Sequence, residues 1–531
     1  MGTKKKAMEL HRGVLSRNGV LGVLGVLGVL GATAVAQSQD APAPGPKPPH
    51  RKWQDVPQPP LDKVQDPKPV VATLKNGVKV FMLEDHELPT IDLTLIVHAG
   101  EDDLPSLFPD APEHPMARAR QKAGLAALAG QVMRSGGTAA KTGDELDEEL
   151  DAMAASVDTG AGHDQAHVRM SCLKESFAPT LAIFADVLKH PAFREERVAL
   201  AKRQHLGALR RRNDNPAGVA GREFSRLIFG DLNPLGWTEE PQTVESITRD
   251  DLVAFYKAAF AHPETAILGA HGDFEAAKLV AALEAAIGDW MGEKDAAPAK
   301  VPVARDGFTG PGAHVYFARK TDVNQSTVIL GEPAIQRKPG DPDYPAAVVA
   351  NSILGGGGFA GRLMQHVRTE MGLAYGCSSR LDAALGHQGT FVMQGQTKCG
   401  STIAMAKAMR KELERLVSEP PSAEDLRVHK QAILERLVFS FASKSQILDR
   451  ALSNEFYGFP QNELEVFQQG LAAVTADDVL RVAKKLFNPA SLTTVVVGND
   501  ADFDGKLEEL GDVRMLDLKD APGPRRGRHR E

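Results

Sequence analysis

The alternation of hydrophobic and polar residues predicts strands from about residue 70 onward. Ile91, Leu93 and Leu95 are separated by polar residues, which is the period of a strand with one buried face. Just before them, residues 74–80 read Leu-Lys-Asn-Gly-Val-Lys-Val, and an Asn-Gly pair supplies the positive φ angles of a tight hairpin turn. We therefore expect a hairpin followed by a longer strand.

Helical spacing follows these strands. The Thr-Gly-Asp-Glu sequence at 142–145 is a capping box, and Leu146, Leu150 and Met153 then recur at the intervals of one buried helix face. Two further helices are predicted, at residues 177–189 and 195–213. The chain therefore mixes helices and strands rather than forming an all-helical or all-strand protein.

A repeat divides the chain into two related halves. Residues 246–252, Ser-Ile-Thr-Arg-Asp-Asp-Leu, recur at 473–479 as Ala-Val-Thr-Ala-Asp-Asp-Val, and both stretches have the form of a capped helix start. Each copy continues into an apolar strand that ends in glycine, at 266–272 and 494–498. Two homologous α+β domains are therefore predicted.

Composition and charge narrow the class of protein. The 531 residues are 42% hydrophobic and 25% charged, which is typical of a globular chain. The formal net charge of −7 argues against general binding to nucleic acid.

The first residues predict export. Basic residues from Lys4 to Arg17 precede an apolar run of Gly-Val-Leu triplets, and Ala34-Val35-Ala36 supplies a cleavage site of the A-x-A type. We expect a periplasmic or secreted protein that begins near Gln37. The alternative is an uncleaved membrane anchor, for which the apolar run is short and rich in glycine.

These patterns give the following division: a signal peptide at 1–36, a Pro-rich linker at 37–67, an N-terminal domain at 68–291, a linker at 292–312, a C-terminal domain at 313–510 and a basic tail at 511–531.

The three cysteines do not form a disulfide framework or a metal cluster. Cys172, Cys377 and Cys399 are few and scattered, so we expect small buried residues. Cys377 and Cys399 would be able to pair if adjacent strands carried them, and their spacing leaves this open.

The segment 355–376 has an unusual layout. Four glycines, Gly355, Gly356, Gly357 and Gly358, and Phe359 precede a predicted helix with Leu363, Val367 and Met371 on one face. Gly372 ends that helix, as glycine commonly does just past the last turn. Arg368 lies in the last turn and Tyr375 just beyond the break, so a cation and a phenol can point to one place beside the glycines.

The glycines alone have other interpretations. A phosphate-binding loop needs Gly-Lys-Ser/Thr, whereas Gly361 is followed by Arg362 and Leu363. A plain flexible turn is an equally good interpretation of the glycines by themselves.

The whole segment resembles the C-terminal-domain signature of the pitrilysin/insulinase family, the inverted HxxEH zinc metallopeptidases that include mitochondrial processing peptidases and respiratory-chain core subunits. The resemblance covers roughly residues 68–510. It implies two homologous α/β-sandwich domains, each an antiparallel-rich sheet with helices packed on it, joined by a linker and enclosing a peptide cavity. In that family the Arg and Tyr at the positions of Arg368 and Tyr375 reach the substrate, and the glycines and Phe359 are expected to contact the peptide.

The zinc-binding block of that family is degenerate here. Its Gly-hydrophobic-small-His-x-x-Glu-His pattern corresponds to Gly-Leu-Ala-Ala-Leu-Ala-Gly-Gln at 124–131, so Ala127 and Gln131 replace the two histidines and Gly130 replaces the glutamate base. Gly207 and Ala208 occupy the expected place of the third ligand, and no Asp or Glu lies between Lys202 and Asn213. No metal is therefore expected on this chain.

A relocated metal site is not expected either. His163 and His167 have an interval of four, but the residues after them predict a strand. Strand residues four apart are separated by about 13 Å and cannot bind one ion.

The resemblance implies a division of labour between two chains. Some family members pair a chain that carries HxxEH with a chain that carries the glycine-rich loop. This chain would then be the non-zinc subunit of an exported heterodimeric zinc metalloendopeptidase, with zinc on an HxxEH-containing partner and with Arg368 and Tyr375 positioning an extended peptide and its oxyanion in trans. The alternative is a catalytically inactive structural or peptide-holding homologue, like the respiratory core subunits, in which both residues are remnants of the fold.

Overall fold

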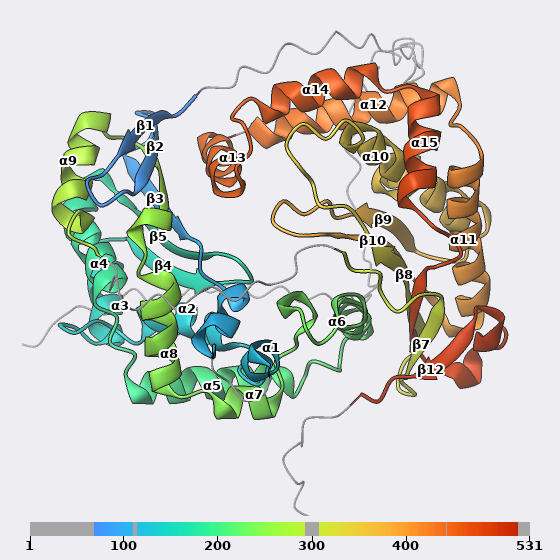
Figure 1. The fold of residues 1–531 in the computed structure, drawn as a ribbon, viewed down its shortest axis with the longest axis horizontal. Helices are drawn as coiled ribbons and strands as arrows, with labels where there is room; N and C mark the ends of the chain where they lie inside the picture. The colour runs from blue at the N-terminus through green and yellow to red at the C-terminus, as the bar shows by residue number, and fades with distance from the viewer. Residues whose placement is uncertain (1–67, 110–113, 292–306, 442, 519–531) are drawn as a thin grey trace, which may run out of the picture. The chain divides into compact units, whose positions relative to one another are not determined.

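The computed structural model describes residues 68–109, 114–291, 307–441 and 443–518 (Figure 1). The predicted signal peptide, the Pro-rich linker, most of the linker at 292–312 and the end of the basic tail lie outside the described residues. Within the described ranges, no helix is both long and apolar enough to cross a membrane.

The first half contains a six-stranded sheet in the order β1-β2-β6-β3-β5-β4. Its strands are β1 (Val70–Thr73), β2 (Lys79–Glu84), β3 (Thr90–Val97), β4 (Ser156–Ala161), β5 (Ala166–Leu173) and β6 (Ile267–Gly272). All neighbouring strands are antiparallel except β2 and β6, which are parallel.

The second half contains a similar sheet in the order β12-β7-β11-β8-β10-β9, in which β7 is parallel to both β11 and β12. Its strands are β7 (His314–Arg319), β8 (Gln325–Pro333), β9 (Gly376–Leu381), β10 (Thr390–Lys398), β11 (Thr493–Gly498) and β12 (Asp512–Met515). β11 lies between β7 and β8 as β6 lies between β2 and β3, which is the relationship expected from the sequence repeat. β12 extends the sheet past residue 510, into the stretch that the sequence analysis assigned to the basic tail.

The helices of the first half are α1 (Pro115–Arg120), α2 (Leu125–Ser135), α3 (Gly143–Ala152), α4 (Phe177–Lys189), α5 (Glu195–Leu209), α6 (Pro216–Phe229), α7 (Pro241–Ser246), α8 (Arg249–Phe255) and α9 (Ala276–Ile287). Those of the second half are α10 (Tyr344–Asn351), α11 (Thr402–Ser418), α12 (Ala423–Val438), α13 (Lys444–Tyr457), α14 (Glu463–Ala473) and α15 (Ala476–Leu486).

Local sequence signals are confirmed where they involve neighbouring residues. Gly77 has a φ of 97° in the turn between β1 and β2. Thr142 caps α3 by accepting a hydrogen bond from the Glu145 amide. The repeated motif forms the same capping box at both α8 and α15, with Thr248 and Thr475 as caps.

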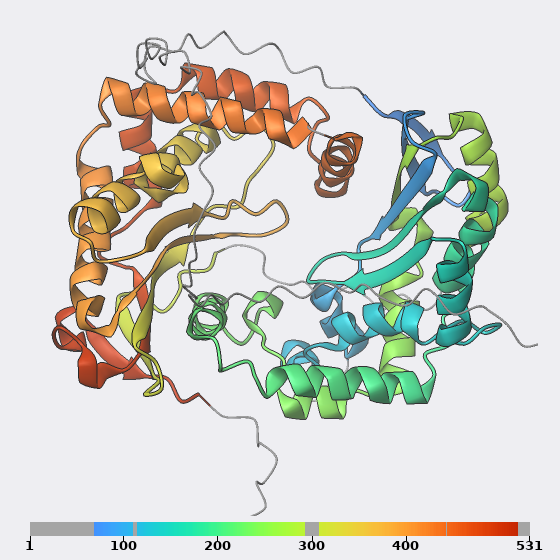
Figure 2. The same ribbon diagram turned by 180° about the vertical axis from the view of Figure 1, so that it is seen from behind.

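Each sheet is buried on both faces. On β2, Val80 and Met82 belong to the main core of the first half, whereas Phe81 and Leu83 face a second cluster. The second cluster is completed by Leu448 and Leu452 of α13. Figure 2 shows this helix beside the first sheet. The helix that covers this face of the first sheet therefore comes from the second half of the sequence.

The second sheet is covered in the same way by α6. Phe224 and Ile228 of α6 pack against Ile329, Val495 and other residues of that sheet. Gly331 makes room for the helix, since a Cβ atom there would lie 2.5 Å from Cζ of Phe224. The two halves thus exchange equivalent helices, α6 and α13.

The cysteines are buried and free. Cys172 lies in β5, Cys377 in β9, and Cys399 follows β10. Cys377 faces Gly395 across the ladder, so the pairing of Cys377 with Cys399 that the spacing left open is not formed.

Candidate functional site

Helix α2 carries the three positions that the sequence analysis assigned to a degenerate zinc site. Ala127 and Gln131 are one turn apart on one face of the helix, as the two histidines of an HxxEH motif would be. Their side chains are a methyl group and an amide. Gly130, which replaces the glutamate base, is buried.

Strand β4 packs directly on Gly130. A Cβ atom on Gly130 would lie 2.3 Å from the backbone nitrogen of Ala161 and 2.5 Å from the carbonyl carbon of Gly160. The hydroxyl of Thr159 donates a hydrogen bond of 2.6 Å to the Gly130 carbonyl oxygen. Helix and strand are therefore held together at a distance that leaves no room for a glutamate.

Gln131 is held by polar residues of α5 and of the segment before α7. Its Oε1 lies 3.0 Å from Nε2 of His205, and its Nε2 donates a 3.1 Å hydrogen bond to Gln204. The other ring nitrogen of His205 lies 3.0 Å from Oε2 of Glu239. Gln204 and His205 lie one turn before Gly207 and Ala208, the positions that the sequence analysis assigned to the third ligand.

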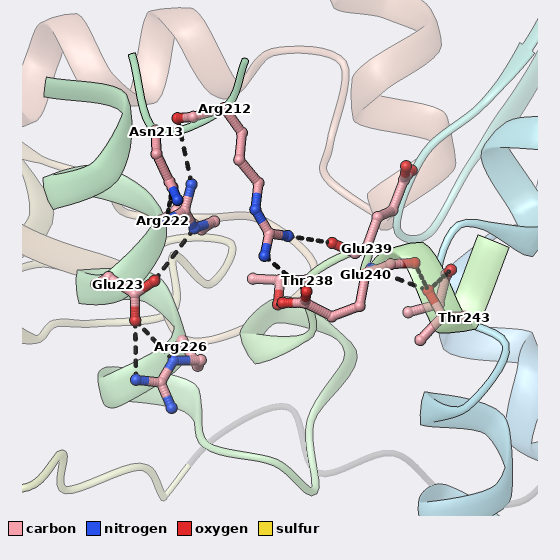
Figure 3. A network of polar contacts seen from close by, with 10 residues as sticks. Arg212, Asn213, Arg222, Glu223, Arg226, Thr238, Glu239, Glu240 and Thr243 are labelled. Carbon is pink, nitrogen blue, oxygen red and sulfur yellow. Dashed lines mark hydrogen bonds and ion pairs between the residues drawn. The ribbon is translucent and has the colours of Figure 1, made fainter. Parts of the chain in front are cut away.

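Glu239 is placed by the network shown in Figure 3. Arg212, which follows α5, donates from Nη1 to the Glu239 carbonyl oxygen and from Nη2 to the Glu240 carboxylate, each at 2.6 Å. On α6, the carboxylate of Glu223 accepts hydrogen bonds from Arg222 and Arg226. The Glu239 carboxylate is left to face His205.

These residues do not fit zinc. The side chains around the expected zinc position are the amides of Gln131 and Gln204 and the imidazole of His205. The described residues contain no group of three or more His, Cys, Asp or Glu side chains that could hold a metal ion. The sequence analysis missed Gln204, His205 and Glu239. The sequence could have indicated His205, because it lies one helix turn from the expected ligand position. No pattern in the sequence indicates Glu239.

A pocket of about 230 Å³ lies beside Ala127, between the start of α2 and the end of β4. It is lined by Glu101 and Glu239, among others. Glu101 accepts a 3.0 Å hydrogen bond from the Gly124 amide at the start of α2, and its buried Oε2 has no hydrogen-bond partner among the described residues. Burial raises the pKa of the Glu101 carboxyl to about 8; the Gly124 hydrogen bond opposes this rise, and the charge of Glu239 adds to it.

The glycines at 355–358 are not a single flexible loop. Gly355 and Gly356 end a π-helix, Ser352–Gly356, that continues α10. A Cβ atom on Gly355 would lie 2.6 Å from the Ser379 nitrogen, and one on Gly357 would lie 2.7 Å from Cε1 of His429. Gly358 has a φ of 64° and open space around it. Tight packing therefore requires Gly355 and Gly357, and Gly358 is the glycine that a peptide can approach.

The next segment is also a π-helix, Leu363–Glu370, a form that is often found at functional sites. Gly372 ends it with a φ of 63°, as predicted. Leu363 and Val367 are buried, whereas Met371, which caps the end of this helix, is 55% exposed.

Arg368, Phe359 and Tyr375 come together at this point. The guanidinium carbon of Arg368 lies 5.0 Å from the ring centroid of Phe359 and 5.5 Å from that of Tyr375. Phe359 is 75% exposed and Tyr375 is 89% exposed. Among the described residues, no carboxylate forms an ion pair with Arg368. The cation is held by two aromatic faces, and its hydrogen-bond donors are available to a ligand.

Tyr375 borders a pocket of about 630 Å³, which is also lined by Gln394, Gln396 and Thr397 of β10. β9, which begins directly after Tyr375, is the edge strand of the second sheet. An edge strand presents unpaired backbone donors and acceptors with which an extended peptide can pair.

Two family models match this sequence, one over the region of α2 and one over the region of Arg368 and Tyr375. Residues 116–221, with α2, match the family model described as insulinase (peptidase family M16). Residues 246–433, with Arg368 and Tyr375, match the one described as peptidase M16 inactive domain. The chain belongs to the insulinase (M16) peptidase family.

Other M16-like proteins are similar along most of their length. An uncharacterized zinc protease of Rickettsia bellii is 24% identical over 436 residues, which are 81% of this chain and 97% of that protein. A crystal structure of a peptidase M16 inactive domain from Pseudomonas fluorescens has 26% identity and a TM-score of 0.66, covering 81% of this chain and 98% of that one. A protease from Helicobacter pylori, at 18% identity, has the same fold with a TM-score of 0.68 over 82% of this chain and all of that one.

The prediction of two α+β domains of the pitrilysin/insulinase type is confirmed by these similarities and by the two equivalent sheets. The chain is an M16 member of the inactive type, since its second half matches the inactive-domain model and α2 lacks the metal-binding side chains.

Proposed function

We propose that this M16 protein is the non-zinc subunit of a two-chain metalloendopeptidase, exported after removal of residues 1–36. The proposal rests on one contrast. Helix α2 has no room for a catalytic glutamate, whereas Tyr375 is exposed and borders a pocket beside an edge strand. Arg368 lies against the Tyr375 ring and forms no ion pair with a carboxylate of the described residues, whereas an arginine that was a mere remnant of the fold would be expected to form one.

Each group has a defined part in this proposal. A peptide pairs with β9 and lies against Gly358 and Phe359. The Arg368 guanidinium donates hydrogen bonds to a peptide carbonyl. The Tyr375 hydroxyl donates to the same carbonyl oxygen as negative charge develops on it, which is the action of a preorganised oxyanion donor. The metal and the general base lie on the partner, which carries HxxEH.

The test combines this chain with an HxxEH-bearing M16 homologue. The mixture should cleave unstructured peptides that neither chain cleaves alone, and this chain by itself should bind no stoichiometric zinc. Tyr375→Phe should lower kcat about 100- to 1000-fold with little change in KM. Arg368→Ala should also raise KM, because it removes a contact that positions the substrate.

Arg427→Ala is the matched control. Arg427 lies on the surface of α12 and pairs with Glu424, so its loss should not change activity. Assembly of each variant should be measured by sedimentation. If the complex assembles and Tyr375→Phe has the wild-type kcat, the chain is the alternative, an inactive structural or peptide-holding homologue.

A further inference from the structure

A third pocket lies among the helices of the second half. It measures about 410 Å³ and is enclosed by α10, α12, α13 and α14, with Leu385 of the β9–β10 loop at one side. It shares no lining residue with the pocket beside Tyr375. Pockets between packed helices, with an apolar lining and a few polar groups, are common places for ligands.

The polar lining of this pocket is dominated by guanidinium groups. Arg337, Arg436 and Arg450 line it together with one carboxylate, Glu463. Arg337 forms a 2.8 Å ion pair with Glu463, so the charges of these two side chains compensate each other. Arg436 and Arg450 also line the pocket, and no second acidic side chain is among the lining residues.

Two of the three arginines lie against aromatic rings, and the third contacts a backbone carbonyl. The guanidinium of Arg337 lies 4.3 Å from the ring centroid of Tyr344, and that of Arg450 lies 4.1 Å from that of Phe441. Arg436 donates a long hydrogen bond of 3.4 Å to the Gly356 carbonyl. Donors held in this way lose little conformational freedom when they bind an anion.

Two buried polar atoms at the pocket have no partner within the described part of the chain. Nε of Arg337 is a donor, and Oε2 of Glu463 is an acceptor. Glu463 is only 7% exposed, so its free oxygen is costly unless a ligand or water hydrogen-bonds to it.

Apart from Tyr344, Ser453 and Asn454, the rest of the lining is apolar. The side chains that form it are Val348, Leu385, Ile433, Leu437, Leu464 and Phe467. An inorganic anion would leave this surface unfilled, whereas an anion with an apolar body would cover it.

We propose that this pocket binds an organic carboxylate with an apolar body, and that its geometry favours the C-terminal residue of a peptide over a free fatty acid. The carboxylate accepts hydrogen bonds from Arg436 and Arg450, and the apolar side chain fills the space between α10, α12 and α14. A peptide residue also carries an N–H beside its carboxylate, which supplies the donor that Oε2 of Glu463 lacks. A fatty acid has no such group.

The test is a titration of the whole chain with small probes, followed by methyl NMR or calorimetry. N-acetyl-L-leucine should bind with a dissociation constant of about 1 mM, which is typical of so small a ligand. N-acetyl-L-leucinamide, which lacks the charge, should bind at least about 10-fold more weakly. Octanoate should bind more weakly than N-acetyl-L-leucine.

Each other outcome has a definite meaning. Equal binding of acid and amide would overturn the role of the arginines, and equal or tighter binding of octanoate would overturn the peptide in favour of a fatty acid. No saturable binding of any probe would overturn the site. None of these results depends on the partner subunit, so failure here is distinguishable from failure of the proposed function.

Substitutions in and outside the pocket test where the ligand binds. Arg436→Gln should lower the affinity for N-acetyl-L-leucine about 10- to 100-fold, which is the usual loss for one charge-assisted hydrogen bond. Arg436 is exposed, so this variant should keep the wild-type melting temperature. Arg427→Gln, on the same helix but outside the pocket, is the control and should bind like the wild type. Wild-type affinity in Arg436→Gln would contradict the assignment.

Discussion

A Cβ atom on Gly130 would lie 2.3 Å from the backbone nitrogen of Ala161. Real Cβ atoms do not approach a backbone atom this closely, so Gly130 is the residue that lets α2 and β4 touch. The position that the family resemblance assigns to a catalytic base is therefore a packing contact between a helix and an edge strand of its sheet.

Gly130→Ala should therefore destabilise the protein, although alanine is normally the better helix former. We expect a loss of about 1–3 kcal/mol in the free energy of unfolding, as for other overpacked sites. Gly207→Ala is the matched control, since Gly207 also lies within a helix but has open space around it. That change should be neutral or stabilising by up to about 1 kcal/mol. Urea unfolding of both variants measures the difference, and equal stabilities would contradict the contact.

Restoring the missing side chains should not restore a metal site. The triple variant Ala127→His, Gly130→Glu, Gln131→His supplies the family motif, but the glutamate meets β4 and the new histidine displaces the contact of Gln131 with His205. We expect a less stable protein that binds no stoichiometric zinc by elemental analysis. Tight binding of one zinc per chain, with wild-type stability, would show that β4 moves away readily.

The buried carboxyl of Glu101 should make stability depend on pH. Its pKa is raised from an ordinary value of 4.5 to about 8, so between these values the folded state holds a proton that the unfolded state has lost. Its contribution to stability is therefore present below about pH 4.5, falls as pH rises through this window, and is absent above pH 8. Each unit of pKa difference corresponds to about 1.4 kcal/mol.

Glu101→Gln removes this titration and keeps an acceptor for the Gly124 amide. The stability of the variant relative to the wild type should increase steadily from pH 5 to pH 8 in urea unfolding experiments. Parallel curves for the two proteins would mean that Glu101 has an ordinary pKa.

The exchanged helices should be important for stability. Phe224→Ala removes a buried ring from the contact of α6 with the second sheet, and Leu452→Ala does the same for α13 on the first sheet. We expect losses of about 3–5 and 2–5 kcal/mol respectively. Leu88→Ala, at a residue that is 66% exposed, should change stability by less than about 0.5 kcal/mol. If Phe224→Ala costs no more than Leu88→Ala, α6 does not pack on the second sheet in solution.

The sequence by itself determined what depends on residues close together in the chain. The Asn-Gly turn at Gly77, the capping boxes at Thr142, Thr248 and Thr475, and the helix stop at Gly372 are all set by backbone and side-chain groups within a few positions of each other. That Ala127, Gly130 and Gln131 stand where the family resemblance places zinc ligands and a base stays a prediction from the sequence.

Only the tertiary structure decided the contacts between distant segments. The apolar faces of α6 and α13 predict burial but do not specify which sheet each helix covers, and the structure shows that each covers the sheet of the other half. In the same way, the sequence indicates only that Gly130 cannot act as a base, whereas the structure shows that it lies in close contact with Ala161. The physical reason is that a hydrophobic pattern indicates only that one face of a helix is buried. Shape complementarity between segments far apart in the chain determines which sheet that face packs against.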